Sequence, residues 1–373
     1  MKLVVLLVAM LLMPSLHMPF NASHDSAERA LDVVREAVDE GAFPGAVALI
    51  GRGDRILAHG AFGYAMIVPE EREMREDTMF DLASLTKPIA TATSIMILVD
   101  RGMIRLDDKV TLFIPDFGKN GKENITVRQL LTHTSGLPAS ESFYRSCSTY
   151  NEVIDAVCNV SLEYGTGEGY IYSDLGYMTL GEIVHRISGK TLDVFAKENI
   201  FEPLGMKNTM FNPEKKDRCA ATELCPWRER VMVGEVHDEN AYAMGGVSGH
   251  AGLFSTARDL CVFAQMMLNN GQYRGKRILS SSAVREMTRD QTGGKGDYGF
   301  GWMTKSEAFS SAGDLLSKRS YGHTGFTGTS IWIDPESELV VILLTNRVHP
   351  TRENNAHIRV RALFANAAAG ALE

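Results

Sequence analysis

Apolar positions near the start of the chain follow first a helical and then a strand-like pattern. Between 26 and 40 they recur at helical spacing, and Gly41 follows as a stop signal. Two short apolar runs come next, at 46–50 and 56–63, and a Gly-Arg-Gly-Asp turn joins them. The pattern predicts a helix followed by a β-hairpin.

A similar pattern recurs near the end of the chain. Apolar runs at 329–333 and 339–345 flank an Asp-Pro-Glu-Ser turn, and a last amphipathic segment covers about 355–369. From about 84 to 279 the pattern is mainly helical, with interruptions by Gly and Pro. Helical segments are predicted at 90–100, 127–131, 177–187 and 257–268.

These elements predict a mixed α/β (α+β) fold. An antiparallel sheet is built from both chain termini and flanked by helices, and a mostly helical region is inserted between its strands. We expect a single bipartite domain over 23–373, with a sheet part at about 25–80 and 310–373 and a helical part at about 81–309. A cleft between the two parts would be a natural substrate site.

The first residues predict a secretion signal. Lys2 precedes an unbroken apolar run at 3–13, followed by Pro14, and the run is too short to span a bilayer. We therefore expect a signal peptide at 1–22, a periplasmic or secreted protein, and no membrane span in the mature chain. The alternative is an over-long gene start with translation beginning at Met18, which would leave the protein cytoplasmic.

Composition narrows the classes of partner. The 373 residues are 45% hydrophobic and 23% charged, as in ordinary globular proteins, with a net charge of −8. No Lys/Arg run is long enough to follow a phosphate backbone, so nucleic-acid binding is disfavoured. The five cysteines are too few for a disulfide scaffold and are interpreted as core residues or free thiols, although Cys219 and Cys225 could pair in an oxidising compartment. Neither a metal nor another cofactor is expected.

The first candidate for chemistry is the pair Ser84 and Lys87. Residues three apart share one face of a helix, so the Lys87 amine can reach the Ser84 hydroxyl. A serine hydroxyl is a weak nucleophile until a neighbouring base takes its proton, and a partly desolvated lysine can serve. Taken alone, this spacing is weak evidence, because Ser and Lys are common.

Two further motifs supply polar groups. Tyr172, Ser173 and Asp174 precede a helical segment, and His323-Thr324-Gly325 opens directly onto a predicted strand through Phe326 to 333. A glycine at a strand edge lets a substrate approach the backbone, whose N–H groups can polarise a carbonyl. Singly, each of these residues is better explained as part of the core.

Two competing sites carry less weight. The segment around Ser248 nearly matches the Gly-x-Ser-x-Gly turn of lipases, but His250 takes the place of the last glycine. His133, within a Thr-His-Thr-Ser-Gly turn, is better interpreted as a hydrogen-bonding partner for a loop than as a catalytic group.

The three motifs together, in this order, resemble the serine β-lactamase and penicillin-binding-protein superfamily. The tyrosine in the second motif and the histidine in the third match its class C-like branch, which includes D-alanyl-D-alanine carboxypeptidases and related esterases. The stretches 125–137 and 251–260 also look like this branch, and the resemblance covers roughly 25–350. The stretches 234–241 and 345–350 look like a sub-branch often found near cell-wall amino-sugar hydrolases.

The resemblance implies a role for each motif. Ser84 attacks a carbonyl, Lys87 accepts or orients its proton, and Tyr172 relays a proton to the leaving group. The backbone N–H groups of Ser84 and Phe326 would form the oxyanion hole. Asp174 and the motif His323, Thr324 and Gly325 would contact the substrate.

Two positions depart from class C β-lactamases. Asp174 stands where those enzymes have asparagine, and an ionised aspartate cannot donate a hydrogen bond to a substrate carbonyl. It could instead pair with Lys87, hold it protonated and shift the base role toward Tyr172. His323 replaces a lysine and is only partly charged at neutral pH. Both changes weaken recognition of an anionic β-lactam.

The sequence therefore predicts a serine hydrolase with an acyl-enzyme on Ser84, acting on a short-chain ester or a D-alanyl peptide. A β-lactamase is the second candidate. A sensor module that binds penicillin or peptidoglycan without turnover is the candidate from another class. The expected partners are a small-molecule ester, a lactam or a peptidoglycan-derived peptide.

Overall fold

The computed structural model describes residues 20–372. The predicted signal peptide at 1–22 lies for the most part outside these residues, and it stays a prediction. Within the described range, no helix is long and apolar enough to cross a membrane.

A seven-stranded antiparallel sheet forms one half of the molecule and joins segments from both ends of the chain. The hairpin β1–β2 pairs through β1 with β14, so the first and last strands of the sequence lie side by side at its centre. β1 and β14 are almost completely buried, which explains their nearly continuous apolar runs. In spatial order the strands are β11 (Met303–Thr304), β12 (Tyr321–Thr324), β13 (Ser330–Asp334), β14 (Leu339–Thr345), β1 (Gly45–Arg52), β2 (Arg55–Met66) and β3 (Arg72–Glu73).

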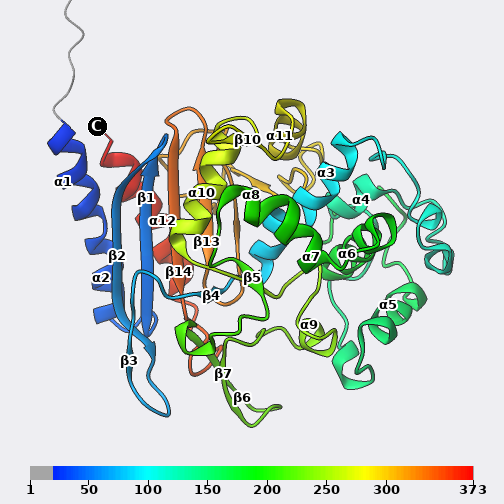
Figure 1. Cartoon of the computed structure of the whole chain (residues 1–373), viewed down its shortest axis with the longest axis horizontal. Helices are drawn as coiled ribbons and strands as arrows, with labels where there is room; N and C mark the ends of the chain where they lie inside the picture. The colour runs from blue at the N-terminus through cyan, green and yellow to red at the C-terminus, as the bar shows by residue number, and fades with distance from the viewer. Residues whose placement is uncertain (1–19, 373) are drawn as a thin grey trace, which may run out of the picture.

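Helices cover both faces of this sheet. The terminal helices α1 (Phe20–Ala30), α2 (Asp32–Asp39) and α12 (His357–Gly370) lie on the outer face, where Figure 1 shows them beside β1 and β2. They share a core with side chains from one face of the strands, such as Ala48 and Leu343. α10 (Ala257–Leu268) packs on the opposite face and joins the larger core.

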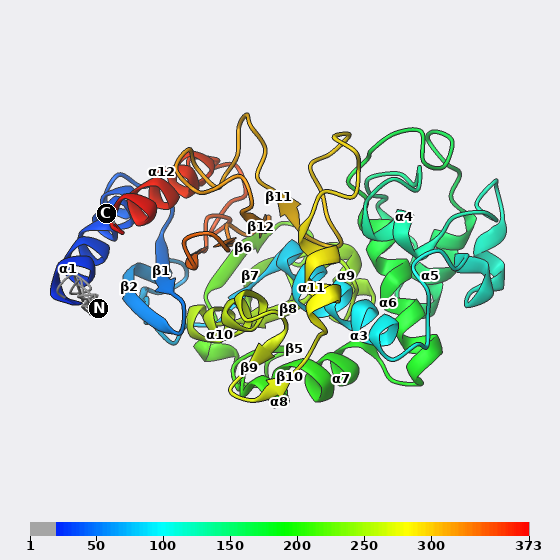
Figure 2. The same cartoon turned by 90° about the horizontal axis from the view of Figure 1, so that it is seen from above.

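The inserted region forms the other half of the molecule (Figure 2). Its α-helices are α3 (Thr93–Asp100), α4 (Val127–Leu131), α5 (Tyr150–Asn159), α6 (Asp174–Ser188), α7 (Leu192–Ala196), α8 (Glu202–Leu204), α9 (Glu239–Ala243) and α11 (Ser281–Thr288). Short strands accompany them: β4 (Phe80–Asp81), β5 (Met210–Phe211), β6 (Ala221–Cys225), β7 (Arg230–Val233), β8 (Leu253–Ser255), β9 (Gln272–Tyr273) and β10 (Lys276–Arg277). Its core continues into the sheet without a break.

The predicted fold class is confirmed, as are both hairpins, α4, α6, α10 and the last helix. Two local predictions are wrong. The first helix is broken at Leu31 into α1 and α2, because a turn there lets both pieces pack on the sheet. The motif at His323 does not open onto one strand through 333, because β12 ends at Thr324 and a turn at 325–329 precedes β13. All five cysteines are free thiols, including Cys219 and Cys225.

Candidate active site

Ser84 lies in a 3₁₀ turn, η1 (Ala83–Leu85), which leads into a buried π-helical stretch, η2 (Lys87–Ala92), and then α3. Ala83 has a φ of 47°, a left-handed conformation that is unfavourable for a residue with a Cβ. The Asp81 carboxylate holds this backbone by accepting from the Ala83 N–H at 2.8 Å. The residue that follows this strained position, Ser84, is only partly buried.

Lys87 is completely buried behind Ser84. Its Nζ lies 3.0 Å from Ser84 Oγ, 3.1 Å from the backbone oxygen of His250 and 2.8 Å from Asp174 Oδ1. Burial disfavours the ammonium, but the Asp174 carboxylate and Tyr172 outweigh it, so the pKa of Lys87 is raised. Lys87 is therefore an ammonium paired with Asp174, which is the arrangement that the sequence left open.

Tyr172 completes the cluster around Ser84. It ends the loop before α6, its ring lies 4.8 Å from Lys87 Nζ, and it packs against His133 with ring centroids 4.4 Å apart. Burial raises the pKa of Tyr172 above its usual value, although hydrogen bonds to Lys87 and Ser84 act in the other direction. The phenol is thus neutral at neutral pH.

His133 has the loop-holding contact predicted for it. Its Nδ1 accepts from the Ser173 N–H at 2.9 Å, and so fixes the backbone between Tyr172 and Asp174. Burial, helped by the charge on Lys87, holds the pKa of His133 well below its usual range, so the ring stays a neutral acceptor.

His323 is buried and neutral. Burial, with the charges of Lys87 and Arg361 nearby, lowers its pKa to about 3. Its Nδ1 donates to the Thr324 carbonyl at 2.8 Å, so its Nε2, 2.7 Å from the Tyr298 hydroxyl, is the acceptor from that group. Both ring nitrogens already have partners. His323 is therefore not a cation that could hold a substrate carboxylate.

The turn after β12 is tied to the segment that precedes Ser84. Gly325 passes so close to Leu82 that a Cβ there would lie 2.4 Å from the Leu82 carbonyl oxygen. Thr327 and Thr329 donate their hydroxyls to the carbonyls of Asp81 and Leu82, at 2.7 and 3.0 Å. These ties hold the turn after β12 beside the turn that carries Ser84.

A cavity of about 360 Å³ opens above this cluster. Six of the predicted residues line it: Ser84, Tyr172, His323, Thr324, Gly325 and Phe326. Asp174 lies at the inner side with Lys87. The structure thus brings all the predicted site residues together.

Basic residues that no sequence motif indicated lie in the wall of the same cavity. Arg347, His357 and Arg361 line the cavity, and no Asp or Glu does. Arg347 lies 4.4 Å from the centre of the Phe326 ring and donates to the Phe326 carbonyl, while Arg361 donates to the carbonyls of Gly325 and Thr329. Burial, and then Arg347, lower the pKa of Arg361 to about 9, so it remains charged at neutral pH. Within residues 20–372, neither arginine forms an ion pair with a carboxylate. Local sequence patterns could not predict that these two side chains lie in the cavity wall.

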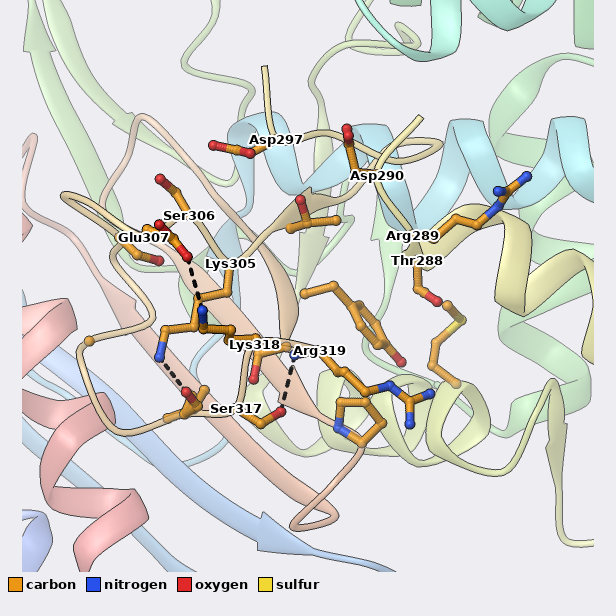
Figure 3. Close-up of a pocket in the computed structure, with 18 of the residues that line it drawn as sticks. Thr288, Arg289, Asp290, Asp297, Lys305, Ser306, Glu307, Ser317, Lys318 and Arg319 are labelled. Atoms are coloured by element: carbon orange, nitrogen blue, oxygen red, sulfur yellow. Dashed lines mark hydrogen bonds and ion pairs between the residues drawn. The ribbon is translucent and has the colours of Figure 1, made fainter. Parts of the chain in front are cut away.

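A larger cavity of about 1170 Å³ lies between α11, β11 and the loop before β12 (Figure 3). Its walls carry charged side chains such as Lys305 and Arg319, together with the ion pair Lys318–Glu307. Its serine hydroxyls have no basic partner of the kind that Ser84 has: Ser317 bonds Asp334 and Ser306 bonds a carbonyl. In the described part of the chain, no three His, Cys, Asp or Glu side chains cluster as a metal site requires.

A sheet built from both termini, an inserted helical region and a Ser-Lys pair at the start of a buried helix define the fold class of the serine β-lactamases and penicillin-binding proteins. The family described as Beta-lactamase matches residues 31–366. The chain therefore belongs to the Beta-lactamase family, a family of hydrolases, and the resemblance drawn from the sequence is confirmed.

Relatives within this family carry several names. The chain is 36% identical over 359 residues to the "N-acetylmuramyl-L-alanine amidase" of Bacillus subtilis (strain 168), covering 86% of this chain and 81% of that protein. It is 34% identical over 355 residues to a "Putative D-alanyl-D-alanine carboxypeptidase" of Escherichia coli (strain K12), covering 85% and 81%. The solved structure of "EstCE1, a hydrolase with promiscuous acyltransferase activity" superposes with a TM-score of 0.76 over 94% of this chain and all of that one, at 24% identity. That last likeness shows the fold.

Proposed function

We propose that this protein is a serine hydrolase that forms an acyl-enzyme on Ser84. The observation that carries the proposal is the 3.0 Å contact between Lys87 Nζ and Ser84 Oγ, at the base of a cavity lined by Tyr172 and the turn after β12. A hydroxyl beside a buried ammonium, a phenol and backbone donors has the groups that acyl transfer needs.

The geometry suggests how the proton moves. Because Asp174 keeps Lys87 protonated, Lys87 stabilises negative charge on the oxygens rather than acting first as a free base. A neutral Tyr172 can take the Ser84 proton on its oxygen while its own proton passes to the leaving group. Ser84 Oγ then bonds the carbonyl carbon, the leaving group departs with that proton, and water later reverses the sequence to release the acid. The N–H groups of Ser84 and Phe326 would hold the oxyanion.

The two arginines in the cavity wall, Arg347 and Arg361, indicate the class of substrate. Arg347 and Arg361 form no ion pair with an acid among the described residues, and they lie beside the turn where the carbonyl would sit. A substrate with a free carboxylate close to the scissile bond would supply the missing partner. An amino acid or peptide leaving group has such a carboxylate, so we propose an amide of a peptidoglycan-derived peptide. The names of the relatives, amidase and carboxypeptidase, support this class.

Two other functions remain second to this one. A β-lactamase would need a donor where Asp174 stands and a cation where neutral His323 stands. A non-catalytic sensor would bind and become acylated without turnover. We also propose export through the signal at 1–22, since a substrate from the cell wall lies outside the cytoplasm.

The test is a turnover assay of the wild type and Ser84→Ala. The substrates are a D-Ala-D-Ala peptide, N-acetylmuramyl-L-alanine, a short-chain nitrophenyl ester and a chromogenic cephalosporin. We expect cleavage of one of the two amides at a higher kcat/KM than the ester or the cephalosporin, and loss of at least about 10³-fold in Ser84→Ala.

The matched control is Ser306→Ala, a serine in the larger cavity, which should keep wild-type turnover. Unchanged turnover in Ser84→Ala would refute the mechanism. A stable acyl adduct on Ser84 with no turnover would instead support the sensor.

A further inference from the structure

A chain of hydrogen-bonded side chains lies directly behind Lys87. Ser248 Oγ is 2.8 Å from His250 Nδ1, and His250 Nε2 is 2.8 Å from Asp238 Oδ1. Ser248 and His250 are each only 2% exposed, and neither lines either of the two cavities described above. None of these three residues has a role in the acyl transfer described above.

The three residue types are those of a Ser-His-Asp triad, but the arrangement argues against a second nucleophile. Ser248 has no open face toward a cavity, so a substrate carbonyl cannot reach its hydroxyl. Ser248 bonds Nδ1 of His250 and Asp238 bonds Nε2, which is the reverse of the pairing in the serine-protease triad. The cluster therefore binds parts of the protein to one another.

The cluster reaches the active site through the backbone of His250. The His250 carbonyl accepts from Lys87 Nζ at 3.1 Å, and the preceding carbonyl, of Gly249, accepts from Thr91 Oγ1 at 2.6 Å. A Cβ on Gly249 would lie 1.9 Å from the Tyr177 carbonyl oxygen, so this segment is packed directly against α6. The side chain of His250 thus fixes a backbone segment that touches η2 at two points.

The far end of the cluster is also anchored. Asp238 caps α9, because its Oδ1 also accepts from the Ala241 N–H at 2.8 Å. Burial acts to raise the pKa of this carboxyl, but the neighbouring His250 and the hydrogen bonds that Asp238 accepts outweigh it and hold the pKa far below its usual range, so the carboxyl is ionised. The start of α9 and the segment 248–250 are therefore connected by a partly buried hydrogen bond to an ionised carboxylate.

We propose that Ser248, His250 and Asp238 form a positioning chain that holds the His250 carbonyl against Lys87 and so orients the ammonium toward Ser84. This inference rests on the proposed acyl transfer at Ser84. A lysine ammonium has three hydrogens, and here three acceptors surround it: a hydroxyl, a carboxylate and this carbonyl. If the carbonyl shifts, the ammonium turns toward Asp174 alone and leaves Ser84.

The experiment compares Ser248→Ala, Asp238→Ser and the double variant in the full chain. Serine at 238 keeps a helix cap but is too short to reach His250, so it breaks the chain and spares α9. We expect each single variant to lower kcat about tenfold to a hundredfold with little change in KM. The double variant should lose no more than the worse single, because both break one chain.

A second readout separates positioning from simple loss of stability. Without the His250 carbonyl as acceptor, the charged form of Lys87 is less stable and its pKa falls. The alkaline limb of the pH–rate profile should therefore move to lower pH. The titratable groups that face Lys87 are unchanged in these variants: Asp174, Tyr172, His133 and His323. The control is Thr209→Val. It removes a buried hydroxyl that donates to the Asp259 carboxylate, far from this chain of side chains in its bonding, and it should lower Tm without changing kcat or the pH–rate profile.

Wild-type kcat and pH profile in both single variants, with a loss of Tm like that of Thr209→Val, would overturn the positioning chain. Ser84→Ala, measured beside them, separates this outcome from failure of the proposed function. Turnover retained in Ser84→Ala, or an acyl group mapped to Ser248, would overturn both.

Discussion

At the scale of single residues, the decisive group is the buried ammonium of Lys87. An isolated charge in a protein interior is costly, and it persists only where it is paired and hydrogen-bonded. The Asp174 carboxylate at 2.8 Å provides the pairing. An asparagine there would remove the charge, which is the largest of the effects that keep the lysine protonated.

Replacing Asp174 by asparagine tests that statement through pH. The carboxylate raises the pKa of Lys87, so in Asp174→Asn the effect of burial prevails and the pKa falls. The proposed mechanism uses the ammonium, so the alkaline limb of kcat/KM against pH should move to lower pH. The cephalosporin should also acylate Ser84 faster, because an amide can donate to the lactam carbonyl.

The matched control is Asp116→Asn, an exposed carboxylate that pairs loosely with Lys119. It should leave both the pH profile and the acylation rate unchanged. An unmoved alkaline limb in Asp174→Asn would mean that Asp174 does not set the charge of Lys87.

At the scale of elements, the candidate site depends on how the turn after β12 meets the turn that carries Ser84. Gly325 has room for no side chain: a Cβ would lie 2.1 Å from Thr329 Oγ1 as well as close to Leu82. The same contact is held by the hydroxyls of Thr327 and Thr329, which donate to the carbonyls of residues 81 and 82. The distance between the two proposed oxyanion donors therefore depends on a glycine.

Gly325→Ala should separate the two turns. We expect kcat to fall at least about a hundredfold, since a misplacement of about 1 Å in a catalytic constellation can cost this much. Tm should fall as well, because backbone atoms must move. Steady-state kinetics and thermal unfolding measure both effects.

Gly370→Ala serves as the control, because a Cβ at the end of α12 meets nothing within 4 Å. It should leave kcat unchanged. Full activity in Gly325→Ala would show that the turn does not contribute to the oxyanion hole.

At the scale of the whole molecule, distant segments meet beside the cavity. Arg352, beyond β14, pairs with Glu223 of β6 and with Glu239 at the start of α9, the latter at 2.8 Å. Glu223 also contacts His237 at 3.1 Å, and the His237 ring stacks on Phe326. The cluster joins the hairpin β6–β7 to the end of the sheet and supports one wall of the site.

Glu223→Gln should weaken this junction in a pH-dependent way. Its pKa is lowered to about 2: burial opposes the shift, but His237 and Arg352 outweigh it. A carboxylate with a depressed pKa stabilises the fold above its ordinary value and loses the effect as pH falls toward 2. The variant should have a Tm about 2–4 °C lower at neutral pH, and the difference should shrink in acid.

Thermal unfolding of wild type and Glu223→Gln across this pH range measures the effect. Glu336→Gln, on the turn between β13 and β14, is the control and should show no such pH-dependent difference. A constant difference at all pH values would mean that Glu223 acts by packing rather than by charge.

Local patterns were sufficient for much of the fold. The hairpin β1–β2, the buried strand β14 and the helices α6 and α10 are encoded by alternation and helical spacing over a few residues. The same patterns failed at Leu31 and after Thr324, where packing on the sheet and contact with Leu82 bend the chain. These bends depend on neighbours far away in the sequence.

For the site, the sequence by itself determined the Ser84–Lys87 spacing, because it is set within one helical turn, and it named the motifs at Tyr172 and His323. Only the tertiary structure decided that Asp174 pairs with Lys87 and that His323 is neutral. It alone placed Arg347 and Arg361 in the wall of the cavity and the chain from Ser248 to Asp238 behind Lys87. Charge state and pairing depend on burial and on contacts between distant segments, and neither is a property of a local stretch of chain.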